Sequence, residues 1–185
     1  MTHQSLSNLQ HYDYYVSMDV ESVGLNGQAF AYALVTYDRY GVIVSKREAV
    51  VSWQICNGTE QSFAWIKQNI PSLTLDAISH PSRESFLESF RTDVESENAR
   101  KGKVVFMADC PFPVETNLIS EAYPSGTNGL FYPFIDIGSV LLAAGLDPIG
   151  TYERLPEELP THDPSCDAMQ SARLFFKALE IIRAT

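Results

Sequence analysis

Long hydrophobic runs are absent from this chain of 185 residues. The longest apolar stretches, residues 29–35 and 140–144, are far shorter than the roughly 20 residues that a membrane-spanning helix needs. Residues 1–15 are polar and lack the basic flank and apolar centre of a signal peptide. We therefore expect a cytoplasmic protein that has no membrane partner.

Cysteine is also scarce. The three cysteines, at positions 56, 110 and 166, match no zinc-binding spacing, and their odd number does not suit a disulfide framework. A reducing, intracellular setting fits this content. Cys110 and Cys166 lie beside acidic residues discussed below, but no histidine and asparagine are arranged around either one as a nucleophilic thiol requires. Packing is therefore the preferred role for both.

Positive charge is in short supply, with 13 Lys and Arg against 23 Asp and Glu and a formal net charge of −10. This balance argues against broad, tight, non-specific binding to nucleic acid, which depends on many contacts between cations and phosphates. It leaves room for a nuclease that holds its substrate through metal ions, since many of the acids would then be ligands.

Apolar periodicity and turn residues divide the chain into strands and helices. Strands are predicted at residues 14–20, 29–37, 42–53, 104–107 and 131–137, with a hairpin loop at 38–41. Helices are predicted at 59–69, from Pro81 to about Arg100, from Pro113 onward, at 139–144, and after a proline-containing loop at 147–161. Asp163 is expected to cap the last helix, with Pro164 at its first position.

This order predicts one α/β domain over residues 1–185, of which residues 1–12 form a flexible N-terminus. Three antiparallel strands followed by parallel strands give a mixed five-stranded sheet flanked by helices. That is the layout of the ribonuclease H-like fold, in which the first strand is central and its end opens onto the active edge of the sheet.

Acidic residues follow the predicted strands and open the last helix. Asp19 and Glu21 end the first strand on one face, because side chains alternate along a strand. Asp109 and Glu115 follow the apolar run 104–108, and Asp167 lies in the last helix. Clustered carboxylates repel one another and resist desolvation, a cost that divalent ions with oxygen ligands remove. The pattern predicts a metal site for phosphate chemistry.

Two of these segments carry a family resemblance. Residues 19–24 read Asp-Val-Glu-Ser-Val-Gly, and residues 162–167 read His-Asp-Pro-Ser-Cys-Asp, ahead of a helix with spaced alanines. Asp-x-Glu alone is a weak signal, but its combination with His-x4-Asp in this order is specific. The chain, from about Tyr14 to Leu179, resembles the DEDDh 3′–5′ exonucleases, the superfamily of ribonuclease T, oligoribonuclease and the polymerase proofreading subunit.

The resemblance implies a phosphodiester hydrolase that uses two Mg²⁺ or Mn²⁺ ions. It would act on the 3′ end of single-stranded RNA or DNA and release nucleoside 5′-monophosphates. Asp19 would bridge both ions, Glu21 and Asp167 would bind the ion that carries the nucleophile, and His162 would be the general base, since imidazoles titrate near neutral pH. Small members of the family are often homodimers, so a homodimer is one expectation by analogy.

The second motif departs from the family pattern, which places an aspartate on the first turn of the helix after the central strand. Asp109 has the expected residue type but lies close to the strand end, whereas Glu115 has the expected helix position but is one methylene longer. We slightly prefer Asp109 as the catalytic metal ligand, with Glu115 as the alternative or as a second contributor. The departure keeps open a catalytically impaired ribonuclease H-like module that binds nucleic acid or protein. A purely acidic interaction domain would leave the His-x4-Asp pattern unexplained.

Further residues are assigned to the substrate. The backbone of Ser22, Val23 and Gly24 would line the pocket for the terminal nucleotide. Trp65, with Phe63, would stack on its base as aromatic residues do in single-strand binders, although core packing is the preferred reading of both rings. Asp136, at the end of the fifth strand, is treated as structural.

Overall fold

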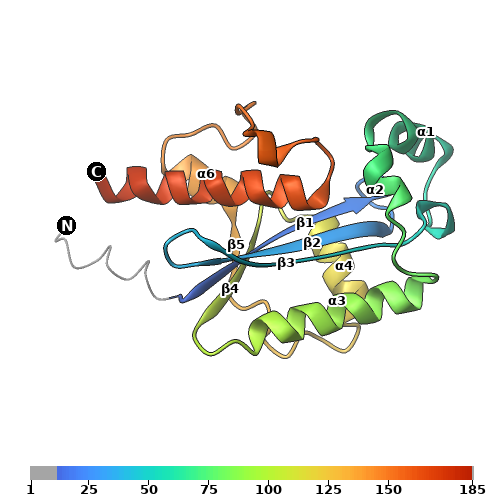
Figure 1. Cartoon of the computed structure of the whole chain (residues 1–185), viewed down its shortest axis with the longest axis horizontal. Coiled ribbons are helices and arrows are strands. Elements are labelled where there is room, and N and C mark those ends of the chain that lie inside the picture. Colours follow the sequence, from blue (N-terminus) through green and yellow to red (C-terminus); the bar gives the residue numbers. More distant parts are fainter. Residues whose placement is uncertain (1–11, 185) are drawn as a thin grey trace.

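A mixed five-stranded sheet organises the molecule (Figure 1). In the computed structural model, which describes residues 12–184, the strands lie in the order β3-β2-β1-β4-β5. They are β1 (Tyr14–Ser22), β2 (Ala29–Asp38), β3 (Ile43–Val50), β4 (Val104–Ala108) and β5 (Phe134–Asp136). β2 is antiparallel to both β1 and β3, and β4 is parallel to both β1 and β5. The predicted fold class and the central place of the first strand are confirmed.

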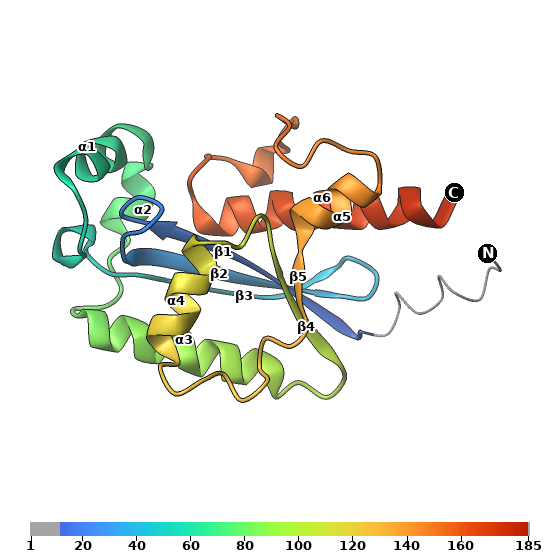
Figure 2. The same ribbon diagram turned by 180° about the vertical axis from the view of Figure 1, so that it is seen from behind.

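Helices cover both faces of the sheet (Figures 1 and 2). They are α1 (Glu60–Asn69), α2 (Ser72–Asp76), α3 (Arg83–Asn98), α4 (Val114–Ala122), α5 (Ile137–Ala143) and α6 (Pro164–Ala184). Side chains of α3 and α4 share one buried cluster, and those of α5 and α6 share the other. α1 and α2 lie beyond the end of β1 rather than over a face. None of the described helices is long and apolar enough to span a membrane.

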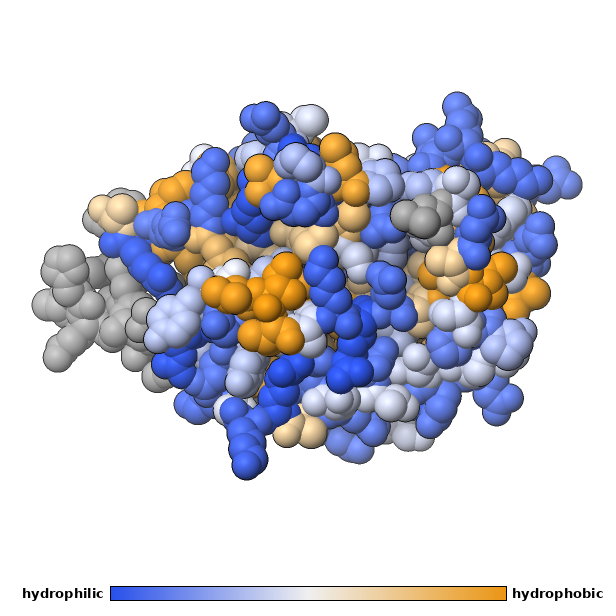
Figure 3. Space-filling model, viewed as in Figure 1, coloured by the Kyte–Doolittle hydropathy of each residue, from blue (hydrophilic) through white to orange (hydrophobic). Residues whose placement is uncertain are grey.

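The surface is mainly hydrophilic on the face that Figure 3 shows, with a few separate hydrophobic patches.

The predicted flexible N-terminus, residues 1–12, lies outside the described residues except for its last one. The described part of the chain therefore begins two residues before the first strand of the sheet.

Several boundaries differ from the prediction. The third strand ends at Val50 rather than at residue 53, because Val51 bridges His80 and a 3₁₀ helix, η2 (Trp53–Ile55), follows. The longer helix begins at Arg83 rather than Pro81, because Ser82 provides the N-cap: its hydroxyl accepts a hydrogen bond from the Ser85 amide at 3.2 Å.

The remaining differences concern short elements. α2 was not predicted, and Pro113 is the N-cap of α4 rather than its first helical residue. The fifth strand covers Phe134–Asp136 only, and α5 starts at the next residue. Strand and helix thus join without a loop, so Asp136 belongs to both the strand end and the start of the helix.

The register of the sheet leaves the end of β1 without a partner on one side. β4 pairs with β1 from Tyr14 to Ser17 only, whereas β2 follows β1 to Ser22. Beyond Ser17 the backbone groups of β1 that face β4 are therefore free of sheet pairing. This overhang carries Asp19 and Glu21.

A buried ion cluster fastens α3 to the opposite end of the sheet. Glu97, whose exposed fraction is 0%, accepts hydrogen bonds from Thr36 at 2.8 Å, Ser45 at 3.1 Å, Arg47 at 2.6 Å and Arg100 at 2.5 Å. Burial alone would raise the pKa of this carboxyl, but the hydrogen bonds from Arg100, Arg47 and Thr36 outweigh it and lower the pKa to about 2. Glu97 therefore stays ionised inside the protein.

Glu97→Gln is expected to lower the free energy of unfolding by about 3 kcal/mol, because it leaves two partly buried guanidinium groups without their carboxylate. The wild type should lose the same contribution as the pH falls from about 4.5 toward about 2, since the folded pKa lies below the ordinary value. Urea unfolding at neutral pH measures the first effect. Glu95→Gln, an exposed change on the same helix, is the control, and equal stabilities of the two variants would contradict a stabilising network.

Candidate metal centre

The overhang of β1 presents two carboxylates on one side. Asp19 and Glu21 are separated by one residue, so the strand points both toward the same face. Glu21 is buried, with 9% of its surface exposed. Its Oε1 lies 3.8 Å from Nδ1 of His162, which comes from the far end of the chain. The end of β1 and the start of α6 therefore meet.

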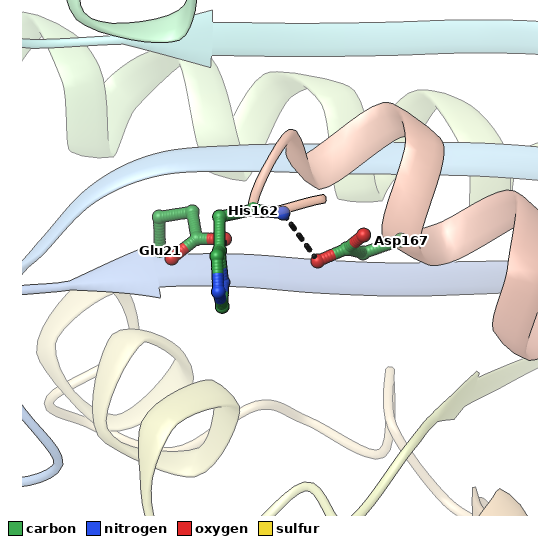
Figure 4. Close-up of side chains that lie close together, drawn as sticks. All are labelled: Glu21, His162 and Asp167. Atoms are coloured by element: carbon green, nitrogen blue, oxygen red, sulfur yellow. Dashed lines mark hydrogen bonds and ion pairs between the residues drawn. The ribbon is translucent and has the colours of Figure 1, made fainter. Parts of the chain in front are cut away.

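The start of α6 is held in the required position by its own cap. Asp163 accepts a hydrogen bond from the Cys166 amide at 3.1 Å, as predicted for a capping residue. His162 adopts a φ of 60°, which is unusual for a residue other than glycine. Its amide donates to Oδ2 of Asp167 at 3.1 Å while its ring faces Glu21 (Figure 4). Possible ligand atoms of Glu21, His162 and Asp167 all lie within 4.8 Å of one another.

Glu115 completes the group of acids from the other side of the overhang. It lies in the first turn of α4 and only 6% of its surface is exposed. Its carboxylate accepts a hydrogen bond from the backbone of Val20, one of the groups that β4 leaves unpaired. The negative charge of Glu115 raises the pKa of both Asp19 and Glu21. Glu115 therefore belongs to the same electrostatic cluster as the two strand carboxylates.

Asp109 is turned more toward α5. Its carboxylate accepts a hydrogen bond from the Cys110 thiol, and the neighbouring carboxylate that acts on it most strongly is Asp136. Asp136 in turn accepts a hydrogen bond from Ser139 in α5. Asp109 contributes least among the acids that act on Asp19. Glu115 thus acts on both β1 carboxylates, whereas Asp109 acts on Asp19 and Glu115 and is itself influenced by Asp136.

Burial and mutual repulsion keep these acids from ionising easily. Burial, followed by the charges of Asp167 and Glu115, raises the pKa of Glu21 to about 9. Burial raises the pKa of Glu115 to about 7. It also raises the pKa of Asp19 well above its usual range, with Glu21 as the next cause. The positive charge near the cluster is therefore too small to balance all of its carboxylates.

The donor set suits a hard divalent cation. The carboxylates offer only oxygen ligands, which Mg²⁺ and Mn²⁺ prefer. A cation would supply the missing charge and would displace the protons that the raised pKa values favour. Asp19, Glu21, Glu115 and Asp167 are the residues that could hold such ions, with Asp109 at the edge.

Metal-free protein is expected to become less stable as the pH rises from about 5 to about 8. Glu21 and Glu115 have raised folded pKa values, so in this window the folded state holds more protons than the unfolded state, and the free energy of unfolding falls with pH. We expect the melting temperature in EDTA to drop by roughly 5 °C. Calorimetry measures this melting temperature at each pH.

Mn²⁺ should raise the melting temperature more at pH 8 than at pH 5. Glu21→Gln should weaken the pH dependence. A melting temperature of the wild type that does not change with pH would contradict the charge crowding.

A cleft lies at the turn that follows β1. It has a volume of about 290 Å³ and is lined by Val23, Gly24 and the start of α1, including Ser62. Gly24 has a φ of +74°, and the Ser22 hydroxyl donates to its carbonyl at 2.9 Å, so the turn after β1 is closed on itself. Val23 and Gly24, two of the residues assigned to the terminal nucleotide, therefore line a hollow at the end of β1.

Trp65 lies outside the core, at a neighbouring hollow that Gly24, Gln61 and Ser62 also line. Its exposed fraction is 44%, and its ring centroid lies 5.2 Å from that of His162 with an interplanar angle of 79°. The preference for core packing is wrong for Trp65. It holds for Phe63, which packs against Trp53 and the buried cluster of α3 and α4.

One residue of the site was not predicted from the sequence. Arg154, in the loop before α6, donates from Nη1 to Oδ1 of Asp167 at 2.5 Å. A lone arginine 13 positions ahead of a motif residue gives no periodic or spacing signal, so only the folded chain reveals this contact.

No protein-family model and no curated protein matches the sequence. Solved structures do match its fold. The nuclease domain of 3′hExo, a DEDDh family member bound to rAMP, has a TM-score of 0.53 and 14% identity, with 94% of each chain covered. S. pombe Pop2p in its Mg²⁺- and Mn²⁺-bound form has a TM-score of 0.64 and 15% identity, with 94% of this chain and 85% of Pop2p covered.

A third similar structure is the zinc-bound complex of E. coli ExoI with single-stranded DNA. Its TM-score is 0.61 at 12% identity, and the match covers 93% of this chain but 40% of ExoI. The fold is thus that of DEDDh exonuclease domains, the ribonuclease H-like fold. At these identities the chemistry has to be inferred from the site.

Proposed function

We propose that this chain is a metal-dependent 3′–5′ exonuclease of the DEDDh type, acting on single-stranded RNA or DNA and releasing nucleoside 5′-monophosphates. The observation that carries the proposal is the convergence of desolvated carboxylates from β1, α4 and α6, with His162 beside Glu21 and Asp167. Such a cluster is costly in itself and is explained if cations bind there. The similar structures support it, since they contain Mg²⁺ and Mn²⁺, rAMP or single-stranded DNA.

Each residue has a distinct role in this proposal. Asp19 would bind both ions, Glu21 and Asp167 would bind one of them, and Glu115 would bind the other. Bound Mg²⁺ or Mn²⁺ would supply the positive charge that orients the scissile phosphate and stabilises the negative charge of the transition state. His162, whose ring is held between Glu21 and Trp65, removes the proton from the attacking water.

The terminal nucleotide occupies the cleft after β1. The backbone of Ser22, Val23 and Gly24 borders its sugar and phosphate, and the exposed Trp65 ring offers a face for its base. Stacking on an aromatic ring is tolerant of sequence, since every base has a π-face. This arrangement suits an enzyme that removes nucleotides successively from a single strand.

A 5′-labelled single-stranded oligonucleotide tests the proposal. With Mn²⁺ we expect a ladder of products that shorten from the 3′ end, together with nucleoside 5′-monophosphates, and EDTA should stop the reaction. RNA and DNA versions of one sequence show which sugar is accepted. Intact substrate with Mn²⁺ would instead favour an inactive binding module, the alternative that the glutamate in the second motif keeps open. Binding of the same oligonucleotide without cleavage would identify that module.

Glu115 and Asp109 are expected to differ as catalytic residues. Because Glu115 acts on both β1 carboxylates and Asp109 is turned toward α5, Glu115→Gln should lower kcat by about 100-fold or more, and Asp109→Asn by less than about tenfold. The proposal thus prefers Glu115, in contrast to the preference from sequence. Single-turnover rates with saturating Mn²⁺ measure both. A larger loss in Asp109→Asn would return the ligand role to Asp109, and full activity in both variants would exclude a second-motif ligand.

A further inference from the structure

A single arginine reaches into the acid cluster. Nη1 of Arg154 donates to Oδ1 of Asp167 at 2.5 Å and to the carbonyl of Glu158 at 2.8 Å. The side chains of Arg154 and Asp167 are 20% and 16% exposed, so the pair is largely shielded from water. Among the described residues, the other ion pair recorded for a member of the cluster is the 3.8 Å contact of His162 with Glu21. Arg154 is therefore the permanent cation of the site.

The segment that carries Arg154 is firmly anchored. Glu158, with 2% of its surface exposed, forms two hydrogen bonds with Arg173 of α6, at 2.5 and 2.8 Å. The amide of Leu155 donates to the same carboxylate at 3.0 Å. This clamp fixes the backbone on both sides of the loop without using Asp167. The contact between Arg154 and Asp167 is thus not needed to hold the loop in place.

Orientation of Asp167 does not depend on Arg154 either. Its Oδ2 accepts the amide of His162 at 3.1 Å, and its backbone is part of the first turn of α6, where its own amide donates to the Asp163 carbonyl at 2.9 Å. What Arg154 adds is charge. It neutralises one carboxylate among several that repel one another.

We propose that Arg154 is the counter-ion of Asp167 in the metal-free protein and competes with the divalent cation for this carboxylate. The inference rests on the proposed function, because it takes Asp167 as a metal ligand. A carboxylate has lone pairs for more than one partner, but a guanidinium and a divalent cation both draw on the same negative charge and repel each other. Binding of the ion therefore weakens or displaces the contact with Arg154.

Two possible roles for Arg154 predict opposite changes in metal affinity when this residue is removed. If it only positioned Asp167, its removal would weaken metal binding, typically by about 10- to 100-fold for a partner that orients a ligand. If it is a competing counter-ion, its removal should strengthen metal binding. The amide of His162 and the helix already orient Asp167. We therefore expect removal of Arg154 to strengthen metal binding.

Arg154→Met is the test, with Mn²⁺ alone as the probe in isothermal titration calorimetry. We expect Mn²⁺ to bind about tenfold more tightly than to the wild type, corresponding to the loss of one charged hydrogen bond that the ion must replace. In EDTA the variant should melt at a lower temperature, because Asp167 is left uncompensated. Arg154→Lys retains the charge and should bind Mn²⁺ with an affinity close to that of the wild type.

Arg173→Met is the matched control, since it removes an arginine from the same clamp but does not touch Asp167. It should lower the melting temperature without tightening Mn²⁺ binding. Equal tightening in both methionine variants would assign the effect to a loosened loop and overturn the proposal, as would weaker or unchanged Mn²⁺ binding in Arg154→Met. Absence of Mn²⁺ binding to the wild type would overturn the metal site itself, and the proposed function with it.

Discussion

Asp19→Asn is expected to abolish nuclease activity while making the metal-free protein more stable. The amide keeps the shape of the side chain but cannot bridge two cations, and charge stabilisation by such ions contributes several kcal/mol, so kcat/KM should fall by about 1,000-fold or more. The loss of one charge relieves repulsion with Glu21, Asp167 and Glu115, which raise the pKa of Asp19 together with its burial. Opposite effects on activity and stability are the signature of a functional carboxylate.

Two measurements on the same preparation check this result. Turnover of a labelled oligonucleotide with Mn²⁺ gives the loss of rate, and a melting curve in EDTA at pH 8 gives the stability. Glu60→Gln, an exposed acidic position on α1, is the control and should change neither. Near wild-type turnover by Asp19→Asn would end the metal-ion proposal. An inactive variant that melts at a lower temperature would show that Asp19 supports the fold rather than suffering from charge crowding.

Most of the fold could be predicted from the sequence because its patterns are local. The apolar runs of β1, β2 and β4 and the stripe of Phe86, Phe90 and Val94 on α3 each satisfy one periodicity, and the order of elements then restricts the topology. The five residues of α2 could not be found in this way, since a helix of that length shows little more than one turn of any pattern. The end of β3 depends on a bridge from Val51 to His80, a contact across 29 positions that no local pattern reports.

The site residues likewise fall into those that a local pattern could predict and those that it could not. Asp19, Glu21, His162 and Asp167 belong to short motifs whose spacing is fixed by one strand and one helix start, and the structure brings them together. The second motif follows a loop, where the direction of a side chain depends on what it meets. Asp109 lies near α5. Glu115, on the first turn of α4, contacts the overhang of β1 instead.

Trp65 shows how position can override composition. Core packing was the preferred reading of this ring, but Ile66, the next residue of α1, is the one that enters the buried cluster, and Trp65 points away from it. It lies instead against the ring of His162. A large exposed aromatic ring next to a cluster of acids is a stronger functional signal than the same ring in a sequence pattern.

His162→Asn is expected to remove most of the activity and to leave metal binding intact. Asparagine tolerates a positive φ better than most residues, so the backbone that presents its amide to Asp167 should persist. The amide side chain cannot act as a base. Loss of general base catalysis lowers the rate by roughly 100- to 10,000-fold. The carboxylates remain, so calorimetry should still report Mn²⁺ binding with an affinity within about threefold of the wild type.

The geometry makes this result decisive, because an atom of the His162 ring also lies within 4.8 Å of ligand atoms of Glu21 and Asp167. If His162 were a ligand, the variant would lose Mn²⁺ binding and activity together. If it were only a loop residue that packs on Trp65, the variant would keep both. His80→Asn, which changes a ring that packs on Phe86 in the other buried layer, is the control and should leave activity and metal binding unchanged. Only loss of turnover with retained Mn²⁺ binding agrees with a base that stands beside the metal ions and takes the proton from the attacking water.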